Sequence, residues 1–379
     1  MILKLFRKNI NKLHTMNSLE GLGWSLVGIY IPIYLKTIGY SWEQVFIYFI
    51  IQNTAILFAS FVVAYLGRIF SLRRVLLIRF PVLFIFLILL FFIETKNISI
   101  YLLALVDGLQ SGMFWLPMHI LFSRFISKDD IEGETSKLFA IPQFICMFGP
   151  LIGGLISSSL NFGFLFGVGF VLFVLAFIPM VMTRIEVTRY DFSMMDGFSL
   201  FKKYPKYFFS ELLLNIAEEI EGVIWPIFVY INVASIASVG FVGTLLAVSS
   251  AVFTLVVGKI SNKRNQRTLI ITGTIVMMMI WFFRFYLEGE LTYYLLTIFS
   301  GIAYVLFSIP YYSGIYKIGK KEKTAVFFAF REVPVWMARV VVFCLALVFV
   351  ENLEVLFLIA GIVYIYFLFW KRSSHDNNN

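Results

Sequence analysis

Long blocks of apolar residues, each about as long as a membrane is thick, constrain this chain more than any other feature of its sequence. Residues 76–93 read LLIRFPVLFIFLILLFFI, and residues 161–183 contain no charged residue. A run of about 20 apolar residues spans the hydrocarbon core of a bilayer as a helix. The runs are continuous rather than alternating, which favours helices over a barrel. Only 14% of the 379 residues are charged, too few for a water-soluble body of this size.

The connections between these blocks alternate in charge, which predicts how the chain is threaded. Basic residues concentrate in the N-terminal tail, in every second connection and at the C-terminus, among them Lys8, Arg73, Lys202, Lys263 and Lys371. The basic residues of the other connections are Lys36 and Lys96. Lys and Arg stay on the cytoplasmic side, so both termini are expected in the cytoplasm. Because topology explains the net charge of +9, we expect no nucleic-acid partner.

Twelve helices fit this pattern. We expect them near 17–36, 42–66, 75–94, 98–122, 134–158, 161–183, 207–231, 236–258, 268–287, 291–316, 324–350 and 353–370. The longest polar stretch predicts an N-terminal six-helix bundle over 1–183, a cytoplasmic linker over 184–206 and a C-terminal bundle over 207–379. We expect a monomeric, multi-pass protein embedded in the lipid bilayer of a bacterial or archaeal plasma membrane.

The two halves also repeat each other. Residues 101–119 (YLLALVDGLQSGMFWLPMH) align with residues 294–312 (YLLTIFSGIAYVLFSIPYY) at a shift of 193 without a gap. A similar shift relates Gly28, Pro32 and Ile33 to Gly222, Pro226 and Ile227. Parallel repeats of this kind place a binding site near the membrane midplane between them. The sequence therefore predicts an all-α polytopic membrane protein, with two parallel six-helix pseudo-repeats around a central cavity.

Short motifs recur at matching places in the two halves. GKISNKRNQR begins with Gly258 and ends with Arg267. Its counterpart in the N-terminal half, AYLGRIFSLR, also ends with an arginine, Arg73, but has Ala64 and Arg68 at its first and fifth positions. Residues 149–154 read GPLIGG, with small or kinking residues at Gly149, Pro150, Gly153 and Gly154.

With these motifs, the architecture resembles the major facilitator superfamily, and within it a drug/proton antiporter or a related bacterial permease. The resemblance implies solute transport and identifies the basic motifs as the family's gating loops. Both copies lack the acidic residue that latches one state in the family. GPLIGG resembles the end of the helix-5 signature of drug/proton antiporters, and it is equally consistent with a kinked, close-packed helix contact.

The predicted seventh helix is unusually acidic. Glu211, Asn215, Glu218 and Gly222 lie on one helical face, and Glu218, Glu219 and Glu221 lie near the membrane midplane. Three carboxylates within four residues repel one another, which favours a bound proton. We expect Glu218 and Glu221 to contribute to a proton or cation site and Glu219 to pair with another helix. The alternative is that arginines hold all three.

Arginines in later helices are the candidate partners of these carboxylates. Arg339 and Arg331 lie in the predicted eleventh helix, which lines the cavity in the resembled family, so pairing between helices 7 and 11 is expected. Arg284 lies near the outer end of the ninth helix, where we expect its side chain to snorkel to the interface.

The N-terminal half offers fewer polar candidates. Asp107, beside Gln110, is expected to be the one carboxylate well inside this half, pairing with the other half or hydrogen-bonding locally. Glu20 is placed near the start of the first helix, where the helix dipole favours an acid, and His119 is interpreted as an interfacial hydrogen-bonder. Neutral candidates for the cavity wall are Gln52, Asn53 and Gln143.

Aromatic residues are abundant on helices that line the cavity in the resembled family. They include Trp24, Tyr30, Tyr34, Trp225, Tyr304, Tyr311 and Tyr312. An aromatic, partly acidic cavity suits amphipathic or cationic solutes through apolar contact and cation–π attraction. For any single residue, packing or an interfacial position is the plainer interpretation.

These features predict a secondary transporter that moves a small molecule by alternating access and is driven by protons or another ion. Export of amphipathic compounds leads narrowly over uptake of a sugar or an organic anion. ATP-binding and catalytic motifs are absent from the sequence, and Cys146 and Cys344 have no metal-site spacing, so we expect neither an enzyme nor a cofactor. An intramembrane enzyme and a non-transporting sensor are the alternatives from other classes.

Overall fold

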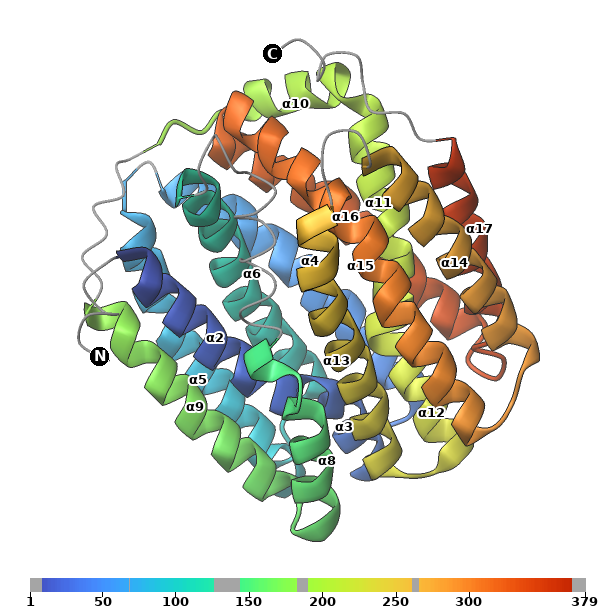
Figure 1. The fold of residues 1–379 in the computed structure, drawn as a ribbon. Helices are drawn as coiled ribbons and strands as arrows, with labels where there is room; N and C mark the ends of the chain where they lie inside the picture. Colours follow the sequence, from blue (N-terminus) through green and yellow to red (C-terminus); the bar gives the residue numbers. More distant parts are fainter. Residues whose placement is uncertain (1–8, 68, 126–143, 183–189, 261–265, 370–379) are drawn as a thin grey trace.

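A computed structural model describes residues 9–67, 69–125, 144–182, 190–260 and 266–369. Within these ranges every regular element is helical (Figure 1). The N-terminal half contains α2 (Asn9–Val27), η1 (Gly28–Tyr30), α3 (Ile31–Thr37), α4 (Trp42–Leu66), α5 (Leu72–Lys96), α6 (Ile100–Phe125), α8 (Gly149–Ser159) and α9 (Phe162–Met182). The short helix α10 (Met194–Lys203) follows.

The C-terminal half continues the helical pattern. It contains α11 (Pro205–Glu219), η2 (Ile220–Ile224), α12 (Trp225–Val233), α13 (Ile236–Ile260), α14 (Gln266–Tyr286), α15 (Glu290–Lys321), α16 (Thr324–Val348) and α17 (Val355–Leu368). Most bounds lie within a few residues of those predicted, although the first helix begins earlier and the tenth ends later. Residues 134–143 of the predicted fifth helix lie outside the described ranges.

Seven of the described helices are long and apolar enough to cross a membrane. The other predicted spans fall short for local reasons. Short non-α turns, η1 and η2, interrupt the first and the seventh span, while α8 and α17 are shorter apolar helices. The eleventh span, α16, carries Arg331, Glu332 and Arg339, which lower its hydropathy. The arrangement is consistent with the predicted twelve-helix, two-repeat architecture.

A glycine and a proline explain why the first span of each half is interrupted at the same place. Proline has no N–H and leaves the carbonyl four residues earlier without its α-helical bond. Pro32 does this to Gly28, where η1 forms, and Pro226 does it to Gly222, inside η2. In η1 the Gly28 carbonyl accepts from Ile31, whereas in η2 Trp225 donates five residues back to Ile220.

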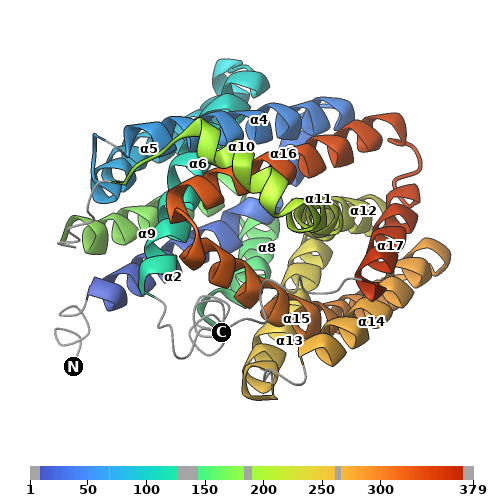
Figure 2. The same cartoon turned by 90° about the horizontal axis from the view of Figure 1, so that it is seen from above.

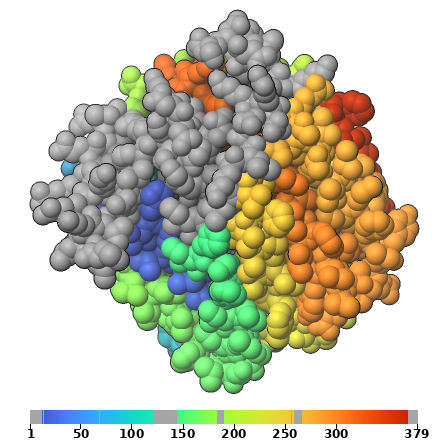
Figure 3. Space-filling view, in the orientation of Figure 1, coloured from blue at the N-terminus to red at the C-terminus, as the bar shows by residue number. Residues whose placement is uncertain are grey.

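The two halves meet along two pairs of helices. Seen from above, α4 lies beside α16, and α8 lies beside α13 (Figure 2); the second pair is also visible on the face drawn in Figure 3. In α8, Gly153 approaches the backbone of Leu26, and the hydroxyl of Tyr30 donates to the carbonyl of Pro150. GPLIGG thus makes a close contact with the first span and, through Pro150 against Gly243, with the other half.

The linker between the halves contains α10, which the sequence did not predict as a helix. Ser193 caps its N-terminus. Lys203 pairs with Glu322 at 2.6 Å and Asp196 with Lys323 at 2.7 Å, so α10 is tied to the connection between α15 and α16.

Three residues of the predicted gating loops lie near the ends of helices. Arg73, in α5, donates to the carbonyl of Val181 in α9 at 2.8 Å. Gly258 lies in α13 and Arg267 in α14, and the connection at 261–265 falls outside the described ranges. The structure therefore gives no latch geometry for the second loop.

Close contact between α4 and α6 depends on two glycines one turn apart. A Cβ atom on Gly112 would lie 2.5 Å from the Ile56 carbonyl oxygen, and one on Gly108 would lie 2.2 Å from that of Gln52. Small residues at this spacing let helix backbones approach in a membrane.

We expect Gly112→Ala to destabilise the protein by about 1–3 kcal/mol, because the added methyl group would force α6 away from α4. Thermal unfolding of the purified protein in detergent measures the loss. Gly167→Ala is the matched control, since a Cβ there meets no atom within 4 Å. Equal melting temperatures for the two variants would contradict this account of the contact.

Candidate transport site

Two adjoining pockets lie between the two halves and share Trp115 and Arg339 in their linings; together they are called the cavity here, and singly its N lobe and C lobe. The N lobe, about 260 Å³, is lined mainly by the N-terminal half, including Trp24, Phe49, Gln52, Asn53, Arg79 and Asp107. The C lobe, about 170 Å³, is lined mainly by the C-terminal half, including Asn215, Glu218, Tyr312, Arg331 and Glu332. The cavity therefore gathers candidates from both halves.

Aromatic contacts between the halves lie on both sides of this cavity. Toward the side opposite the basic connections, the rings of Phe49 and Phe343 stack at 4.7 Å. Toward the side of the basic connections, His119 stacks on Phe328 at 5.2 Å and meets the Tyr316 hydroxyl at 3.3 Å. His119 makes a hydrogen-bond contact, as expected, but it lies in the wall of the C lobe between the halves rather than at the membrane interface.

The acidic segment of the seventh span divides its carboxylates among different partners. The π-helical turn η2 inserts an extra residue per turn just after Glu219, and such turns often occur at functional sites. Glu218 and Glu219 face the cavity lobes, whereas Glu221 points to α14 and α15. Glu218 and Glu221 therefore do not share one site, contrary to the expectation from the sequence.

Glu218 is held by hydroxyl groups rather than by an arginine. Tyr304 and Tyr312 donate to its Oε1 atom at 2.8 and 2.6 Å. Both tyrosines come from α15, and the ion pairs found in the described residues do not include Glu218. Its carboxylate therefore lies on the wall of the C lobe with neutral donors alone in direct contact.

Two arginines of α16 pair with the seventh span, as predicted. Arg331 meets Glu211 at 2.6 Å, and Tyr311 donates to the same carboxylate at 2.9 Å. Arg339 lies 3.2 Å from Glu219 and donates to the Asn53 side chain of α4 at 3.2 Å. Arg339 thus links a carboxylate of one half to an amide of the other across the cavity.

The expectation that Arg284 snorkels to the interface is wrong. Its side chain is fully buried and pairs with both oxygens of Glu221, at 2.6 and 2.9 Å. The guanidinium also stacks on Trp225 and Trp281, 4.0 and 4.5 Å from the ring centroids. Trp225 therefore packs behind the cavity. The sequence signal for this burial of Arg284 is a charged residue inside an apolar helix, with tryptophans available to pack against it.

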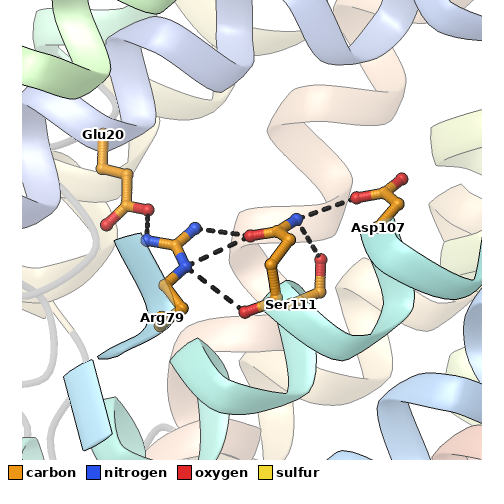
Figure 4. A network of polar contacts seen from close by, with 5 residues as sticks. Glu20, Arg79, Asp107 and Ser111 are labelled. Atoms are coloured by element: carbon orange, nitrogen blue, oxygen red, sulfur yellow. Dashed lines mark hydrogen bonds and ion pairs between the residues drawn. The ribbon is translucent and has the colours of Figure 1, made fainter. Parts of the chain in front are cut away.

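The N-terminal half contains a buried network that the sequence interpretation missed (Figure 4). Glu20 forms an ion pair with Arg79, and the Arg79 side chain also donates to the Gln110 amide oxygen at 2.7 Å. The Gln110 amide donates to Asp107 at 2.8 Å. Asp107 is not the one carboxylate inside this half, because Glu20 is 1% exposed. Arg79 lies within the apolar block 76–93, which the sequence interpretation treated only as a membrane-spanning helix.

Asp107 is satisfied locally rather than by the other half. Its Oδ2 atom accepts from the hydroxyl of Tyr48 at 2.5 Å and from the amide of Gln52 at 2.6 Å. Of the remaining predicted residues, Trp24 lines the N lobe, Asn215 lines the C lobe, and Tyr30 lies at the contact between the halves. Gln143 lies outside the described ranges.

Among the buried and partly buried residues of the described spans, carboxylates outnumber guanidinium groups. In the described spans the carboxylates are Glu20, Asp107, Glu211, Glu218, Glu219, Glu221 and Glu332, and the guanidinium groups are those of Arg79, Arg284, Arg331 and Arg339. Each arginine pairs with one glutamate. The three carboxylates left without an arginine within ion-pair distance, Asp107, Glu218 and Glu332, all line the cavity.

Two six-helix halves around a polar cavity define a polytopic protein with a transporter fold. The family model of the Major Facilitator Superfamily matches residues 13–192. The structure is similar to that of the nucleoside transporter NupG, with a TM-score of 0.72 and 13% identity over 96% of this chain and 98% of that one. The human organic anion transporter MFSD10 (TETRAN) gives a TM-score of 0.72 at 10% identity, covering 96% and 99%.

The family match over the N-terminal half and the shared fold confirm the resemblance to the major facilitator superfamily seen in the sequence. The uncharacterized protein YqgE of Bacillus subtilis (strain 168) is 24% identical over 328 residues, which cover 82% of this chain and 74% of that protein. Family and fold support secondary transport of a small molecule across a membrane.

We expect Arg284→Leu to destabilise the protein by about 3–5 kcal/mol, because it leaves the Glu221 carboxylate buried without a counter-ion. The double variant Arg284→Leu, Glu221→Leu removes both charges and should recover most of the loss. Thermal unfolding in detergent compares the two. A double variant no more stable than the single one would show that the pair is not the relevant interaction.

Proposed function

We propose that this protein is a proton-coupled secondary transporter that exports amphipathic compounds by alternating access. In this proposal it lies in the plasma membrane with both termini in the cytoplasm, as the basic connections indicate. The observation that carries the proposal is Glu218. Its carboxylate lines the C lobe, accepts from two tyrosine hydroxyls and has no arginine in direct contact.

A buried carboxylate of this kind is suited to carry a proton. Keeping a charge inside the membrane is costly unless a cation or strong donors compensate it. The tyrosine hydroxyls of Tyr304 and Tyr312 stabilise the ionised form, and a bound proton removes the remaining charge. Protonation therefore changes the charge of the cavity wall by one unit, which can bias the equilibrium between two arrangements of the halves.

The chemistry of the cavity supports an amphipathic solute, with a preference for a cation. Indole and phenyl rings of Trp24, Phe49 and Trp115 line the lobes, and three carboxylates there lack an ion-paired arginine. Aromatic faces bind apolar surface and attract cations. The volumes of the two lobes, about 260 and 170 Å³, suit a small molecule.

A second candidate is proton-coupled uptake of a sugar or an organic anion. It is supported by Arg339, which lines both lobes and is partly exposed to them. A non-transporting sensor or an intramembrane enzyme would show no solute flux in proteoliposomes.

We expect Glu218→Gln to reduce solute flux driven by an imposed pH gradient to the level of protein-free liposomes, because the amide cannot exchange a proton. A flux screen of cationic dyes, sugars and organic anions in proteoliposomes, with and without the gradient, provides the assay. Exchange of labelled solute at equal pH on both sides of the membrane should persist. Its persistence would show that the variant still binds solute and still alternates between the two arrangements of the halves. Glu43→Gln, which alters an exposed residue at the start of α4, is the control. Gradient-driven flux unchanged in Glu218→Gln rules out this coupling site.

We expect Arg339→Gln to separate the two candidate substrates. Loss of its positive charge leaves Glu219 uncompensated, which should strengthen binding of a cationic solute and weaken that of an anion. Competition of unlabelled solutes against the best transported compound of the screen measures the change in affinity. Weaker binding of cationic solutes would favour the organic-anion permease instead.

A further inference from the structure

We propose that residues 190–203 form a strap that holds the two halves together on the side of the basic connections. The strap consists of α10 and the short segment 190–193 that precedes it. Its effect on transport rests on the alternating access of the proposed function, whereas its contacts do not. No residue of the strap lines either lobe of the cavity, so it is separate from the candidate transport site.

One end of the strap is attached to the C-terminal half. Asp196 pairs with Lys323 at 2.7 Å, and Lys203 pairs with Glu322 at 2.6 Å. Both partners belong to the connection between α15 and α16. In Figures 1 and 2, α10 lies beside the end of α16. These contacts make α10 follow the C-terminal half when the halves move relative to each other.

A phenylalanine of α16 packs directly against the backbone of α10. A Cβ atom on Gly197 would overlap the ring of Phe330, so a side chain at this position would force the two helices apart. Phe330 is 1% exposed, and its ring lies 5.6 Å from that of Phe198 and 5.8 Å from that of Phe201. The attachment of α10 to α16 therefore depends on the glycine at position 197.

The other end of the strap is attached to α4 of the N-terminal half. The hydroxyl of Tyr190 donates to the carbonyl of Val63 at 3.2 Å. Tyr190 also packs against Gly67, where a Cβ atom would overlap its hydroxyl group. Phe192 is 6% exposed, and its ring lies 6.3 Å from that of Phe61. Residues 190–192 are thus held at the end of α4.

Three phenylalanine rings join the two attachments. Phe61 of α4 and Phe330 of α16 meet edge to face at 5.3 Å, and Phe192 of the strap lies 6.3 and 6.4 Å from them. Aromatic pairs of this kind stabilise a contact beyond the apolar area that they bury. If α4 moves away from α16 at this end, Phe61 loses both partners, because the strap stays with the C-terminal half.

The strap acts on one end of the contact between α4 and α16. Toward the opposite side of the membrane, this contact is made by the stacked rings of Phe49 and Phe343, and between the two ends Arg339 donates to Asn53. Alternating access requires the halves to separate on one side at a time. The strap therefore stabilises the arrangement that is closed on the side of the basic connections, and its loss shifts the population toward the open one.

Distances between spin labels on the two halves test the strap in the full chain, reconstituted in lipid nanodiscs. The background variant has Cys146→Ala and Cys344→Ala. Labels attached through Arg74→Cys and Lys321→Cys report on the side of the basic connections, and labels attached through Lys96→Cys and Glu288→Cys report on the opposite side. All four labelled positions are exposed.

We expect Gly197→Leu to lengthen the distance on the side of the basic connections and to leave the opposite distance unchanged, because leucine pushes α10 away from Phe330. Ser199→Leu adds the same side chain at an exposed position of α10 and should keep both wild-type distances. An unchanged distance on the side of the basic connections in Gly197→Leu overturns the strap. Lengthening of both distances also overturns it, since that result means a general loosening of the protein.

Phe192→Ala keeps the test decisive if Gly197→Leu fails to fold. It removes the two ring contacts of Phe192, so we expect the population open on the side of the basic connections to rise roughly 10-fold. Wild-type distance distributions in this variant would contradict the strap. Absence of solute flux in proteoliposomes would refute the proposed function and leave the spin-label distances as the test of the strap.

Discussion

The compensation of buried carboxylates by arginines is the interaction on which the rest of this structure depends. Lipid tails are as apolar as the helices, so the hydrophobic effect gives little drive for one helix to choose another. A glutamate in the bilayer, by contrast, is costly until a cation reaches it. The pairs Glu20–Arg79, Glu221–Arg284, Glu211–Arg331 and Glu219–Arg339 therefore fix which spans adjoin, in both halves.

The balance between buried carboxylates and arginines also indicates where the candidate transport site lies. Carboxylates that arginines neutralise become structural, while those left over must be compensated by a proton, a solute or hydroxyl and amide donors. Asp107, Glu218 and Glu332 are left over, and all three line the cavity between the halves. Arg339 lies at the junction of the two lobes, where its contacts with Glu219 and Asn53 connect the halves. In the proposed function, a transported cation and a bound proton would compete for this excess of negative charge.

The architecture could be predicted from the sequence because it follows from repeated patterns: apolar blocks, alternating connections and the shift of 193. Pairing between helices 7 and 11 also followed, since the resembled family places them together. The partners of Arg284, Arg79 and Glu20 could not be predicted in this way. Burial of a charged side chain depends on whether a counter-charge from a distant helix reaches it, and spacing along one helix carries no information on that.

The interrupted spans show how a local rule produces a functional difference. Glycine and proline four residues apart break the α-helical bond at equivalent places in both halves, yet η1 tightens the helix and η2 widens it. In a regular helix Glu218 and Glu221 would lie about 60° apart on one face. The extra residue of η2 turns the following segment, so that Glu221 reaches Arg284 while Glu218 stays with the tyrosines of α15. The wider turn therefore separates a neutralised, structural carboxylate from the one to which the proposed function assigns the proton.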